Sequence, residues 1–424
     1  MKKVGILFIV LIIASLVLAA CSSKETTPAV TSVPENPEVV VQPTSALVLN
    51  SSGESMACAL ASLIPEVPAD QIPPIPLASE DDWIQGSLDA EVSIIEYSDF
   101  QCPYCAIAAP QLEQFFADNS DKVNFVFRSL PLISIHPNSM FAHRAAEAAG
   151  AQGQFFKMHD VLFENQKAWS SMAQEDLLDY FKGLAENLGL DLTKFEEVYN
   201  SEDTINKLSV AYSDATENIG ITATPTVFVV INGVPYSASY DYATLTGILK
   251  LIELNNNRYM ECPPMVVDTS VTYEATVSTT KGDFVIELYP DKAPLTVNSF
   301  VYLASEGFYN NVDFHRVIPG FVAQVGDPTG MGIGGPGYTY VNEITDLTFD
   351  SEGVVGMANS GADSNGSQFF ITYAAQPDLD GSYTVFGKVV SGLDVVESLT
   401  AVDPSNGVTA DTLDKIISIS ISEK

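Results

Sequence analysis

The chain contains 424 residues, enough for two or more domains that each have a core of their own. It carries 54 acidic residues against 19 lysines and arginines, which gives a formal net charge of −35. So acidic a surface repels nucleic acid and anionic lipid headgroups. The composition therefore argues against nucleic-acid binding and against a polybasic contact with a membrane.

The N-terminus has the pattern of an export signal. Two lysines precede an apolar run, Val4–Leu18, and small residues follow it. The string Leu18-Ala19-Ala20-Cys21 resembles a bacterial lipobox, which implies that residues 1–20 are a signal peptide and that Cys21 is lipidated. The alternative is an uncleaved anchor helix, since the run is nearly long enough to span a membrane. Both interpretations predict a bacterial protein held on the extracytoplasmic face of the cell membrane, lipid-anchored in the first case.

Residues 21–75 read as a tether followed by a short pre-domain segment. The first part, to residue 55, is rich in Ser, Thr, Pro, Val and Glu and shows no sustained period. The run Met56–Leu63 is apolar and predicts a short helix, after which five prolines between residues 65 and 76 break regular structure.

Residues 76–257 alternate predicted strands and helices. The pattern gives a β-α-β start, a helical insertion over 138–218 and a β-β-α finish. The expected elements are the strand Val92–Tyr97, the helix Ala106–Phe116, the strand Val123–Leu130, the strand Thr226–Ile231, a hairpin turn at Asn232-Gly233 with a second short strand, and the helix Tyr242–Leu254.

Cys102-Pro103-Tyr104-Cys105 lies between the first of these strands and its helix. A cysteine at a helix N-terminus forms a thiolate readily, because unpaired N–H groups and the helix dipole stabilise the anion. The one-turn spacing lets the second thiol attack a mixed disulfide made by the first. We expect Cys102 to be the exposed nucleophile and Cys105 the buried resolving thiol. Half of a zinc site and two inert thiols remain as alternatives, although no second CxxC pair exists.

This segment resembles a DsbA-like thiol oxidoreductase, from Asp99-Phe100-Gln101-Cys102 through Ala223-Thr224-Pro225-Thr226. The resemblance implies an α/β thioredoxin-like fold with a helical insertion. It also implies a cis peptide bond between Thr224 and Pro225 that faces the two cysteines, where its backbone pairs with the substrate. Tyr104 lacks the cationic character of the histidine in some relatives, so we expect a less oxidising couple than theirs.

Residues 258–272 read as a linker, and the pattern changes after them. Residues 273–424 show short alternating strands with glycine-rich turns, which predicts an all-β-dominated closed barrel with one or two helices. The expected elements are the strands Val277–Thr280 and Asp283–Tyr289, the strand-rich stretch Phe314–Gly326 and the helix Ala293–Glu306.

Three motifs in this region resemble the cyclophilin signature. They are Phe314-His315-Arg316-Val317-Ile318-Pro319-Gly320-Phe321-Val322-Ala323-Gln324-Val325-Gly326-Asp327, Gly356-Met357-Ala358-Asn359 and Asn365-Gly366-Ser367-Gln368-Phe369-Phe370-Ile371. The resemblance runs from about 273 to 422 and implies peptidyl-prolyl cis–trans isomerase activity, which needs no cofactor and no metal.

The resemblance also implies roles for single residues. Arg316 would withdraw the prolyl nitrogen lone pair that gives the peptide bond its barrier of about 18–20 kcal/mol. Gln324 would hold Arg316 and the substrate carbonyl, and Asn359 would pair with the substrate backbone. The proline ring would enter an apolar pocket formed by Phe321, Val322, Phe370 and Leu379.

Two positions depart from the best-known eukaryotic pattern. Tyr383 replaces a pocket histidine, and Asp378 stands where a tryptophan contacts cyclosporin in sensitive members. An amphipathic tyrosine can still form a pocket wall, so isomerase activity is expected to survive. His315 points to the opposite strand face from Arg316, which favours a structural role.

Two cysteines remain, Cys58 and Cys262, just before and just after the thioredoxin-like segment. An even pair in an oxidising compartment, close to the ends of one domain, predicts a structural disulfide that clasps both flanking segments onto that domain. Free thiols or an intermolecular bond are the alternatives.

The motifs together predict an extracytoplasmic folding catalyst that combines thiol–disulfide exchange with proline isomerisation. Its expected partners are unfolded or newly exported polypeptides, a redox partner for Cys102 and Cys105, and the membrane through the lipid on Cys21. Two alternatives stay open: a non-catalytic holdase or adhesin that only binds extended peptides, and a reductase dedicated to one partner.

Overall fold

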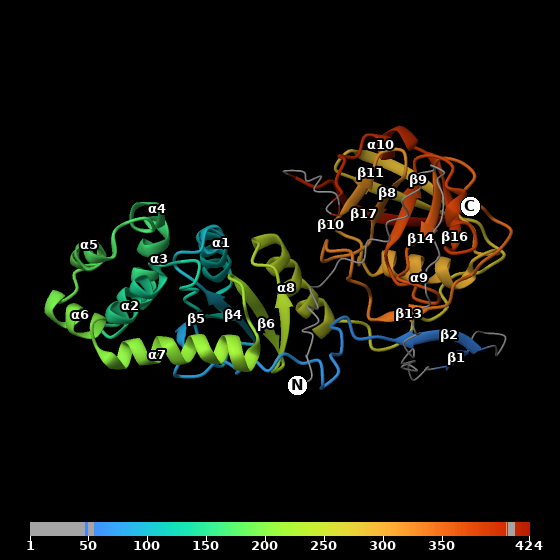
Figure 1. Cartoon of the computed structure of the whole chain (residues 1–424). Helices are drawn as coiled ribbons and strands as arrows, with labels where there is room; N and C mark the ends of the chain where they lie inside the picture. Colours follow the sequence, from blue (N-terminus) through green and yellow to red (C-terminus); the bar gives the residue numbers. More distant parts are fainter. Residues whose placement is uncertain (1–46, 50–54, 404, 406–411) are drawn as a thin grey trace, which may run out of the picture. The chain divides into compact units, whose positions relative to one another are not determined.

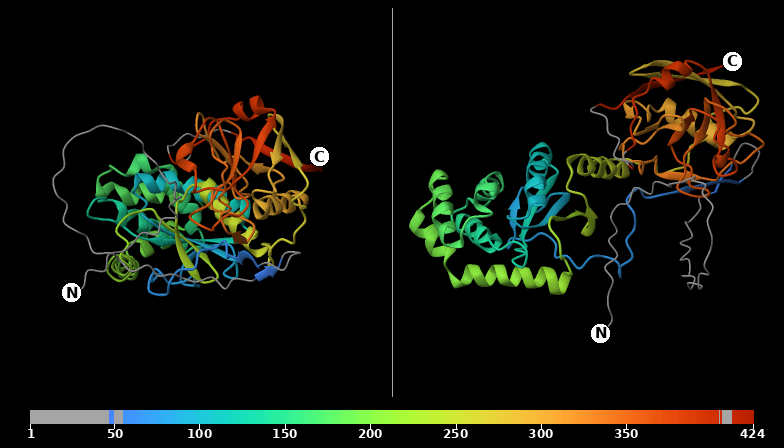
Figure 2. Two further views of the ribbon diagram at one scale, coloured as in Figure 1. Left: turned by 90° about the vertical axis from the view of Figure 1, so that its right-hand side faces the viewer. Right: turned by 45° about the horizontal axis from the view of Figure 1, so that its top comes forward.

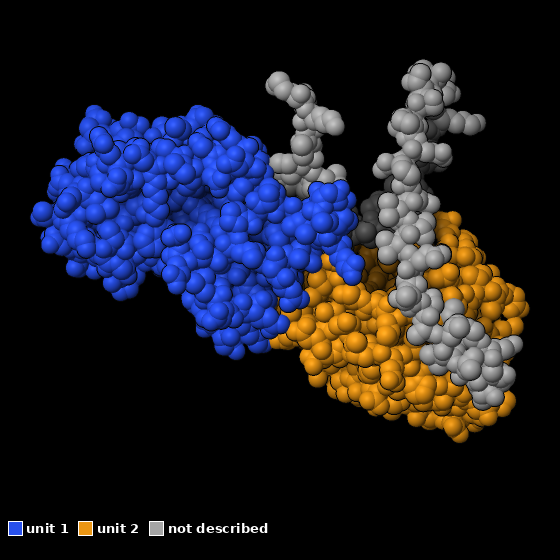
Figure 3. All heavy atoms as spheres, turned by 90° about the horizontal axis from the view of Figure 1, so that it is seen from below, with its two compact units in different colours: residues 1–11, 66–246 blue, residues 12–65, 247–424 orange. Residues whose placement is uncertain are grey.

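A computed structural model describes residues 47–49, 55–403, 405 and 412–424, and the side chains from residue 58 onward. The proposed signal peptide, Cys21 and the first part of the tether lie outside the described residues. The rest divides into two compact units, residues 66–246 (unit 1) and residues 47–65 with 247–424 (unit 2), coloured separately in Figure 3. Among the described helices, none combines the length and apolar character that a membrane span requires.

Unit 1 is built on a five-stranded sheet of order β3-β5-β4-β6-β7. Its strands are β3 (Trp83–Gln85), β4 (Val92–Ser98), β5 (Val123–Ser129), β6 (Thr226–Ile231) and β7 (Val234–Ala238). The β4–β5 pair is parallel and the other pairs are antiparallel. The central strand β4 is buried along almost its whole length, which explains why its sequence reads as a nearly continuous apolar run.

The helices of unit 1 follow the expected order. Helix α1 (Pro103–Asn119) connects β4 to β5, and α8 (Tyr242–Asn256) follows β7 and continues past residue 246, where unit 1 ends, into unit 2. Between β5 and β6 lies the helical insertion, which consists of α2 (Ser139–Gly150), α3 (Phe155–Glu164), α4 (Gln166–Trp169), α5 (Gln174–Asn187), α6 (Leu192–Tyr199), α7 (Glu202–Ser213) and a π-helical turn (Asp214–Ile219).

The insertion packs around buried side chains of its own and also directly against the sheet, where Phe155 of α3 stacks on Trp83 of β3 with ring centres 4.3 Å apart. The indole of Trp169 is fully buried, donates to the carbonyl of Leu162 over 2.9 Å and packs edge-on against Phe181. Helix α7 contacts both α2 and β5, and Figures 1 and 2 show it running along one side of the unit from the insertion to the sheet. Its N-cap Ser201 accepts a hydrogen bond from the amide of Thr204, which fixes where the helix begins.

Unit 2 contains a nine-stranded antiparallel sheet of order β10-β17-β8-β9-β16-β14-β15-β12-β11. The strands are β8 (Tyr273–Thr279), β9 (Gly282–Leu288), β10 (Val312–Asp313), β11 (Arg316–Ile318), β12 (Val322–Val325), β14 (Val354–Met357), β15 (Phe369–Thr372), β16 (Val385–Ser391) and β17 (Lys415–Glu423). Helices α9 (Pro294–Ser305) and α10 (Leu393–Glu397) accompany it, and the buried face of α9 belongs to the main core.

The sheet of unit 2 is a curled half-barrel, so the expectation of a closed barrel is wrong. The two end strands, β10 and β11, contain only two and three residues and form no ladder with each other among the described residues. Residues Phe314 and His315 connect them along the chain. Strands this short leave the two edges unpaired with each other, and the sheet curls without closing.

The segment before unit 1 pairs with unit 2. The helix expected over Met56–Leu63 is wrong: residues Ser55–Leu60 form strand β2, which lies between β1 (Leu47–Leu49) and β13 (Tyr338–Tyr340). Pairing with β13, a strand far along the chain, overrides the local apolar pattern.

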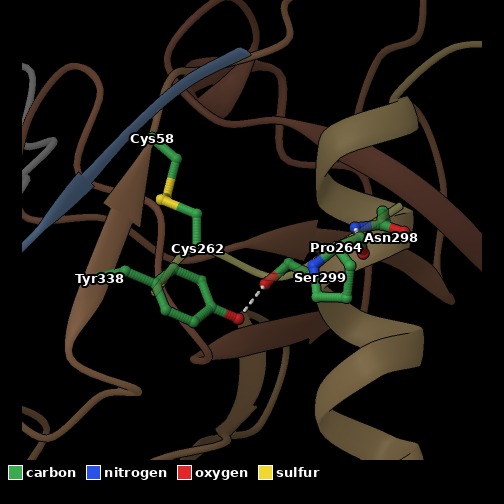
Figure 4. The surroundings of a disulfide bond; sticks show 6 residues. All are labelled: Cys58, Cys262, Pro264, Asn298, Ser299 and Tyr338. Atoms are coloured by element: carbon green, nitrogen blue, oxygen red, sulfur yellow. Dashed lines mark hydrogen bonds between the residues drawn. A yellow bond between two sulfur atoms is a disulfide. The ribbon is translucent and has the colours of Figure 1, made fainter. Parts of the chain in front are cut away.

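Cys58 of β2 and Cys262 form a disulfide. Figure 4 shows it beside the ring of Tyr338, whose hydroxyl shares a 2.9 Å hydrogen bond with Ser299 of α9. Both cysteines pack into the core of unit 2, so the expectation that this bond clasps the flanking segments onto the thioredoxin-like domain is wrong. The bond joins them to the other unit, because β2 pairs there.

The segment 258–272, interpreted from the sequence as a linker, also packs against unit 2. The amide of Val266 donates to the side chain of Asn298 over 2.6 Å, and that side chain donates in turn to the carbonyl of Pro264 over 2.9 Å. Val267 is buried in the main core of the unit.

Candidate active sites

The thiol site lies at the N-terminus of α1. Cys102 is the N-cap residue with extended backbone angles, and Pro103 occupies the first helical position, where its missing N–H costs nothing. The thiol of Cys102 contacts the carbonyl oxygen of Thr224 over 3.3 Å, and the bond between Thr224 and Pro225 is cis, as the resemblance implied. The structure therefore brings together all four residues expected at this site.

The pKa values of the two thiols are shifted in opposite directions. The hydrogen bond from the Cys105 thiol, supported by Thr224 and by the amides of Tyr104 and Cys105, lowers the pKa of Cys102 to about 5 against the effect of burial. Burial, together with the neighbouring Cys102 and Glu96, raises the pKa of Cys105 well above its ordinary value. At neutral pH Cys102 is the thiolate and Cys105 the thiol.

Cys102 is less accessible than expected. Only 4% of its surface is exposed, and Cys105 is fully buried. The peptide of Thr224 lies against the sulfur of Cys102 and takes the place of solvent. The neighbouring side chains of Tyr104 and Ile107 are exposed by 63% and 54%, so an apolar surface borders the nucleophile.

Glu96 is a functional candidate that sequence reasoning missed. It lies on β4, is fully buried, and burial raises its pKa to about 7 although Ser98 donates to it over 2.7 Å. Its second carboxyl oxygen has no hydrogen-bond partner among the described residues, and its charge acts on both cysteines. A single acid inside an apolar strand was the available signal, because such a residue is rare without a function.

Asp99 and Gln166 hold the loop that carries Cys102. The carboxylate of Asp99 accepts from the amides of Gln101 and Leu132 and from His136, each over 2.8 Å. Burial is the largest single influence and would raise the pKa of Asp99, but the hydrogen bonds from His136, Ser139 and the Leu132 amide and the nearby His143 together outweigh it, so the pKa lies below the usual value. The buried side chain of Gln166 donates to the carbonyls of Phe100 and Cys102. The helical insertion thereby fixes the nucleophile.

The second site is a row of side chains across four strands of unit 2. In the strand register Arg316 lies opposite Gln324, Gln324 opposite Phe370, and Phe370 opposite Gly356. Residues directly opposite each other in antiparallel strands share one face, so the row lies on one side of the sheet. The intervening residues, Val317, Ala323, Ile371 and Val355, point to the other side and form part of the main core.

A separate apolar cluster surrounds this row. Gly356 leaves room for it, because a methyl group there would lie 2.6 Å from the ring of Phe370 and 2.7 Å from that of Phe349. The buried members are Val322, Phe349, Val354, Phe370, Leu379 and Val385, with Phe321, Leu347, Ala358 and Tyr383 packed against them. All the expected pocket residues belong to it, and Tyr383 meets the edge of Phe370 with ring centres 5.5 Å apart.

Arg316 lies at the border of the cluster with unused hydrogen-bonding capacity. Its guanidinium is 5.5 Å from the ring centre of Phe321, and its buried Nε has no partner among the described residues. Gln324 was expected to hold Arg316, but its side-chain amide instead donates to Gln368 over 2.9 Å. A buried donor without a partner is rare in folded proteins and fits a partner that a ligand supplies.

Two further expected residues lie close by with other roles. The side-chain amide of Asn359 donates to the carbonyl of Ser382 and its oxygen accepts from the amide of Gly361, so its side chain is already engaged. His315 is buried, and burial lowers its pKa, which keeps it neutral in the structure. Asp378 is exposed.

Gln368 is the residue that sequence reasoning missed here. It accepts from Gln324 and donates to the carbonyl of Gly334 over 2.9 Å, so it fixes which way the Gln324 amide points. Its position inside a recognised motif was the available signal. Within the described residues, no group of three His, Cys, Asp or Glu side chains is arranged to hold a metal ion at either site.

Comparisons with known proteins match both units. The family described as cyclophilin type peptidyl-prolyl cis-trans isomerase/CLD matches residues 274–421, and a thioredoxin family matches residues 78–251. The chain is 47% identical over 137 residues to peptidyl-prolyl cis-trans isomerase-like 1 of Emericella nidulans, covering 31% of this chain and 85% of that protein.

The chain is also similar to a second curated isomerase and to a solved structure. Identity is 52% over 132 residues with peptidyl-prolyl cis-trans isomerase-like 2 of Rhizopus delemar, covering 30% of this chain and 25% of that protein. The crystal structure of a Cryptosporidium parvum cyclophilin type isomerase is 35% identical, covers 36% of this chain and 99% of its own, and gives a TM-score of 0.34.

The lowered pKa of Cys102 predicts the pH dependence of its alkylation. The rate with iodoacetamide should rise with the thiolate and reach half its maximum near pH 5, whereas an ordinary thiol does so near about 8.5. Cys105→Ala should move the midpoint to higher pH, because the hydrogen bond from Cys105 is the largest cause of the shift. Faster labelling of Cys105 than of Cys102, read by peptide mass spectrometry, would contradict the assignment.

The raised pKa of Glu96 predicts that it destabilises unit 1 at high pH. Its carboxyl is protonated in both states below pH 4.5, and its folded form resists ionisation up to about pH 7. Stability is therefore lost as pH rises through this window, by about 3 kcal/mol at its upper end. Glu96→Gln should recover this stability at pH 8 and change little at pH 4.

The measurement is denaturant unfolding followed by tryptophan fluorescence, because both tryptophans, Trp83 and Trp169, lie in unit 1. Glu186→Gln, which alters an exposed carboxylate of α5, is the matched control and should have no comparable effect. A Glu96→Gln protein that is less stable than the parent at pH 8 would refute the assignment.

Proposed function

Because the chain belongs to the cyclophilin-type peptidyl-prolyl cis–trans isomerase family through residues 274–421, and carries a thioredoxin-like domain in residues 78–251, we propose that it is a folding catalyst with two activities. Unit 2 isomerises X–Pro peptide bonds, and unit 1 exchanges thiols and disulfides through Cys102 and Cys105. Both reactions are slow steps of folding when uncatalysed.

The observation that carries the isomerase activity is the unpartnered Nε of Arg316 beside an apolar cluster. The proline ring of a substrate enters the cluster between Phe370 and Leu379. The guanidinium then donates to the prolyl nitrogen as that atom becomes pyramidal, which weakens its conjugation with the carbonyl. Gln324, oriented by Gln368, donates to the substrate carbonyl.

The proposed thiol activity follows from the low pKa of Cys102 and the high pKa of Cys105. In one direction, the Cys102 thiolate attacks a substrate disulfide, forms a mixed disulfide and releases one substrate sulfur as a thiolate. Cys105 then loses its proton to Glu96, attacks the Cys102 sulfur and releases the second substrate thiolate, which leaves a Cys102–Cys105 disulfide and a reduced substrate. The reverse sequence oxidises a substrate dithiol.

The stabilised thiolate favours the oxidising direction. A low pKa at Cys102 stabilises the dithiol form of the couple and so raises its reduction potential. We propose on this basis that the Cys102–Cys105 disulfide oxidises substrate dithiols, in preference to a reductase dedicated to one partner. The negative charge that Glu96 acquires at high pH acts in the opposite sense, because it repels the Cys102 thiolate.

We further propose that the protein acts outside the cytoplasmic membrane, held there by a lipid on Cys21. The support is the charged and apolar N-terminal sequence that ends in Leu18-Ala19-Ala20-Cys21. Newly exported polypeptides are substrates for both reactions, since their cysteines are still reduced and their X–Pro bonds have not yet reached the native cis or trans state. A pure peptide-binding role has no need of the paired thiols or of Arg316.

Replacement of Arg316 tests the isomerase. Arg316→Ala should lower kcat/KM for an X–Pro peptide by about 10²–10³-fold, because the guanidinium acts mainly on the twisted state. Arg316→Lys keeps the charge without the planar guanidinium, so its kcat/KM should lie between those of the parent protein and Arg316→Ala. Near-normal turnover in a folded Arg316→Ala protein, in a protease-coupled or NMR exchange assay, would remove Arg316 from the mechanism.

Removal of the resolving thiol tests the exchange reaction. Cys105→Ala should accumulate mixed disulfides between Cys102 and substrate proteins, because the second thiol that releases the substrate is absent. The complexes should appear on non-reducing gels and vanish with reductant. The double variant Cys102→Ala/Cys105→Ala is the control, and complexes of equal amount in it would show that other thiols form them.

A further inference from the structure

A glycine-rich loop, Met331–Gly337, is hydrogen-bonded to a side chain of the isomerase site. Through its Gly334 carbonyl it accepts the hydrogen bond of Gln368, which orients Gln324. A change in the position of this loop is therefore passed to a side chain that contacts substrate in the proposed mechanism.

From inside the unit, the loop is held by one buried carboxylate. Asp327 accepts from the amides of Gly332 and Ile333 and from the amide and hydroxyl of Thr329. Gly334 packs so tightly against Asp327 that a side chain there would overlap the carboxylate. These contacts lie within the residues that match the cyclophilin family.

From outside, the loop is held by residues that do not belong to that match. The amide of Ala61 donates to the carbonyl of Gly337 over 2.8 Å. The amide of Tyr259 donates to the carbonyl of Pro336 over 3.0 Å. The stem of Arg258 lies over Gly337, where an added methyl group would be 2.5 Å from its Cβ. Strand β2 continues this contact by pairing with β13, which follows the loop directly.

The two outer segments are joined to each other by the disulfide. Cys58 lies opposite Tyr340 in the β2–β13 pair, and Cys262 follows Arg258 and Tyr259 closely in the chain. We name the set formed by residues 58–61, residues 258–262 and this bond the brace. Every member of it belongs to unit 2.

We propose that the brace positions the isomerase site: it holds the Met331–Gly337 loop so that Gln368 presents Gln324 in the orientation that binds substrate. The residues concerned are positioning residues, since they act through Gln368. The inference rests on the isomerase function proposed above. Its physical basis is that a loop of this glycine content loses much conformational freedom when ordered, so contacts on two sides are needed to fix one carbonyl oxygen.

Removal of the disulfide is the first test. In Cys58→Ser/Cys262→Ser the loop should loosen, and kcat/KM for an X–Pro peptide should fall roughly three- to tenfold at a temperature well below unfolding. Amide hydrogen exchange at Gly332 and Ile333 should accelerate while exchange in β8 and β9 stays unchanged. Unchanged kcat/KM together with unchanged loop exchange would overturn the proposal.

A double-mutant cycle separates positioning from general loss of stability. In a Gln368→Ala background the link between loop and Gln324 is already broken, so removal of the disulfide should then change kcat/KM by less than about twofold. An equal fold-loss in both backgrounds would show that the brace does not act through Gln368 and would overturn the proposal.

Arg258 offers a test that leaves the disulfide intact, in case the cysteine variants fail to fold. Arg258→Ala keeps the Cβ but removes the Cγ and Cδ that lie 2.9 and 3.0 Å from the position of an added methyl group on Gly337, and it should lower kcat/KM and loop protection in the same way. Arg258→Met keeps the stem without the charge and should retain both. A wild-type protein without isomerase activity would refute the proposed function alone, whereas loop exchange that ignores every brace variant would refute the brace.

Discussion

The isomerase unit depends on the register of four antiparallel strands, β11, β12, β15 and β14. This register places Arg316, Gln324, Phe370 and Gly356 in one row and sends their neighbours into the main core. A slip of one residue in any of these strands would exchange the two sets, because the side-chain period is two. The site is therefore fixed by the same hydrophobic burial that folds the sheet, and Gly356 is the point at which the row leaves space for aromatic rings.

In unit 1, one short segment likewise places two cysteines in different environments, which shift the pKa values of their thiols in opposite directions. Cys102 receives amide and thiol hydrogen bonds at the start of α1, while Cys105, one turn further, is enclosed beside Glu96. The helical insertion contributes through Gln166, which holds the Cys102 carbonyl. The insertion is thus part of the thiol site as well as a cover for the sheet.

The sequence predicted most local features and missed those that depend on distant pairing. The bounds of β6 agree with expectation because its apolar run is short and flanked by Pro225 and Asn232-Gly233. Strand β2 was interpreted as a helix, because only its partner β13 makes it a strand. Strand β3 was missed, since three residues carry no periodic signal. At the sites, residues within motifs were identified, whereas Glu96 and Gln368 acquire their roles only through contacts that the chain makes in three dimensions.

The pairing of β2 with β13 also constrains how the chain assembles. β2 precedes unit 1, and its partner lies beyond unit 1 and beyond the first strands of unit 2, so β2 has no partner until much later residues have emerged. Cys58 meets Cys102 and Cys105 along the chain before it can meet Cys262. The low solvent exposure of Cys102 and its contact with Thr224 are both complete within residues 66–246, so folded unit 1 exposes little of that thiol to Cys58 of its own chain. Folding of unit 1 before unit 2 therefore favours the pairing of Cys58 with Cys262.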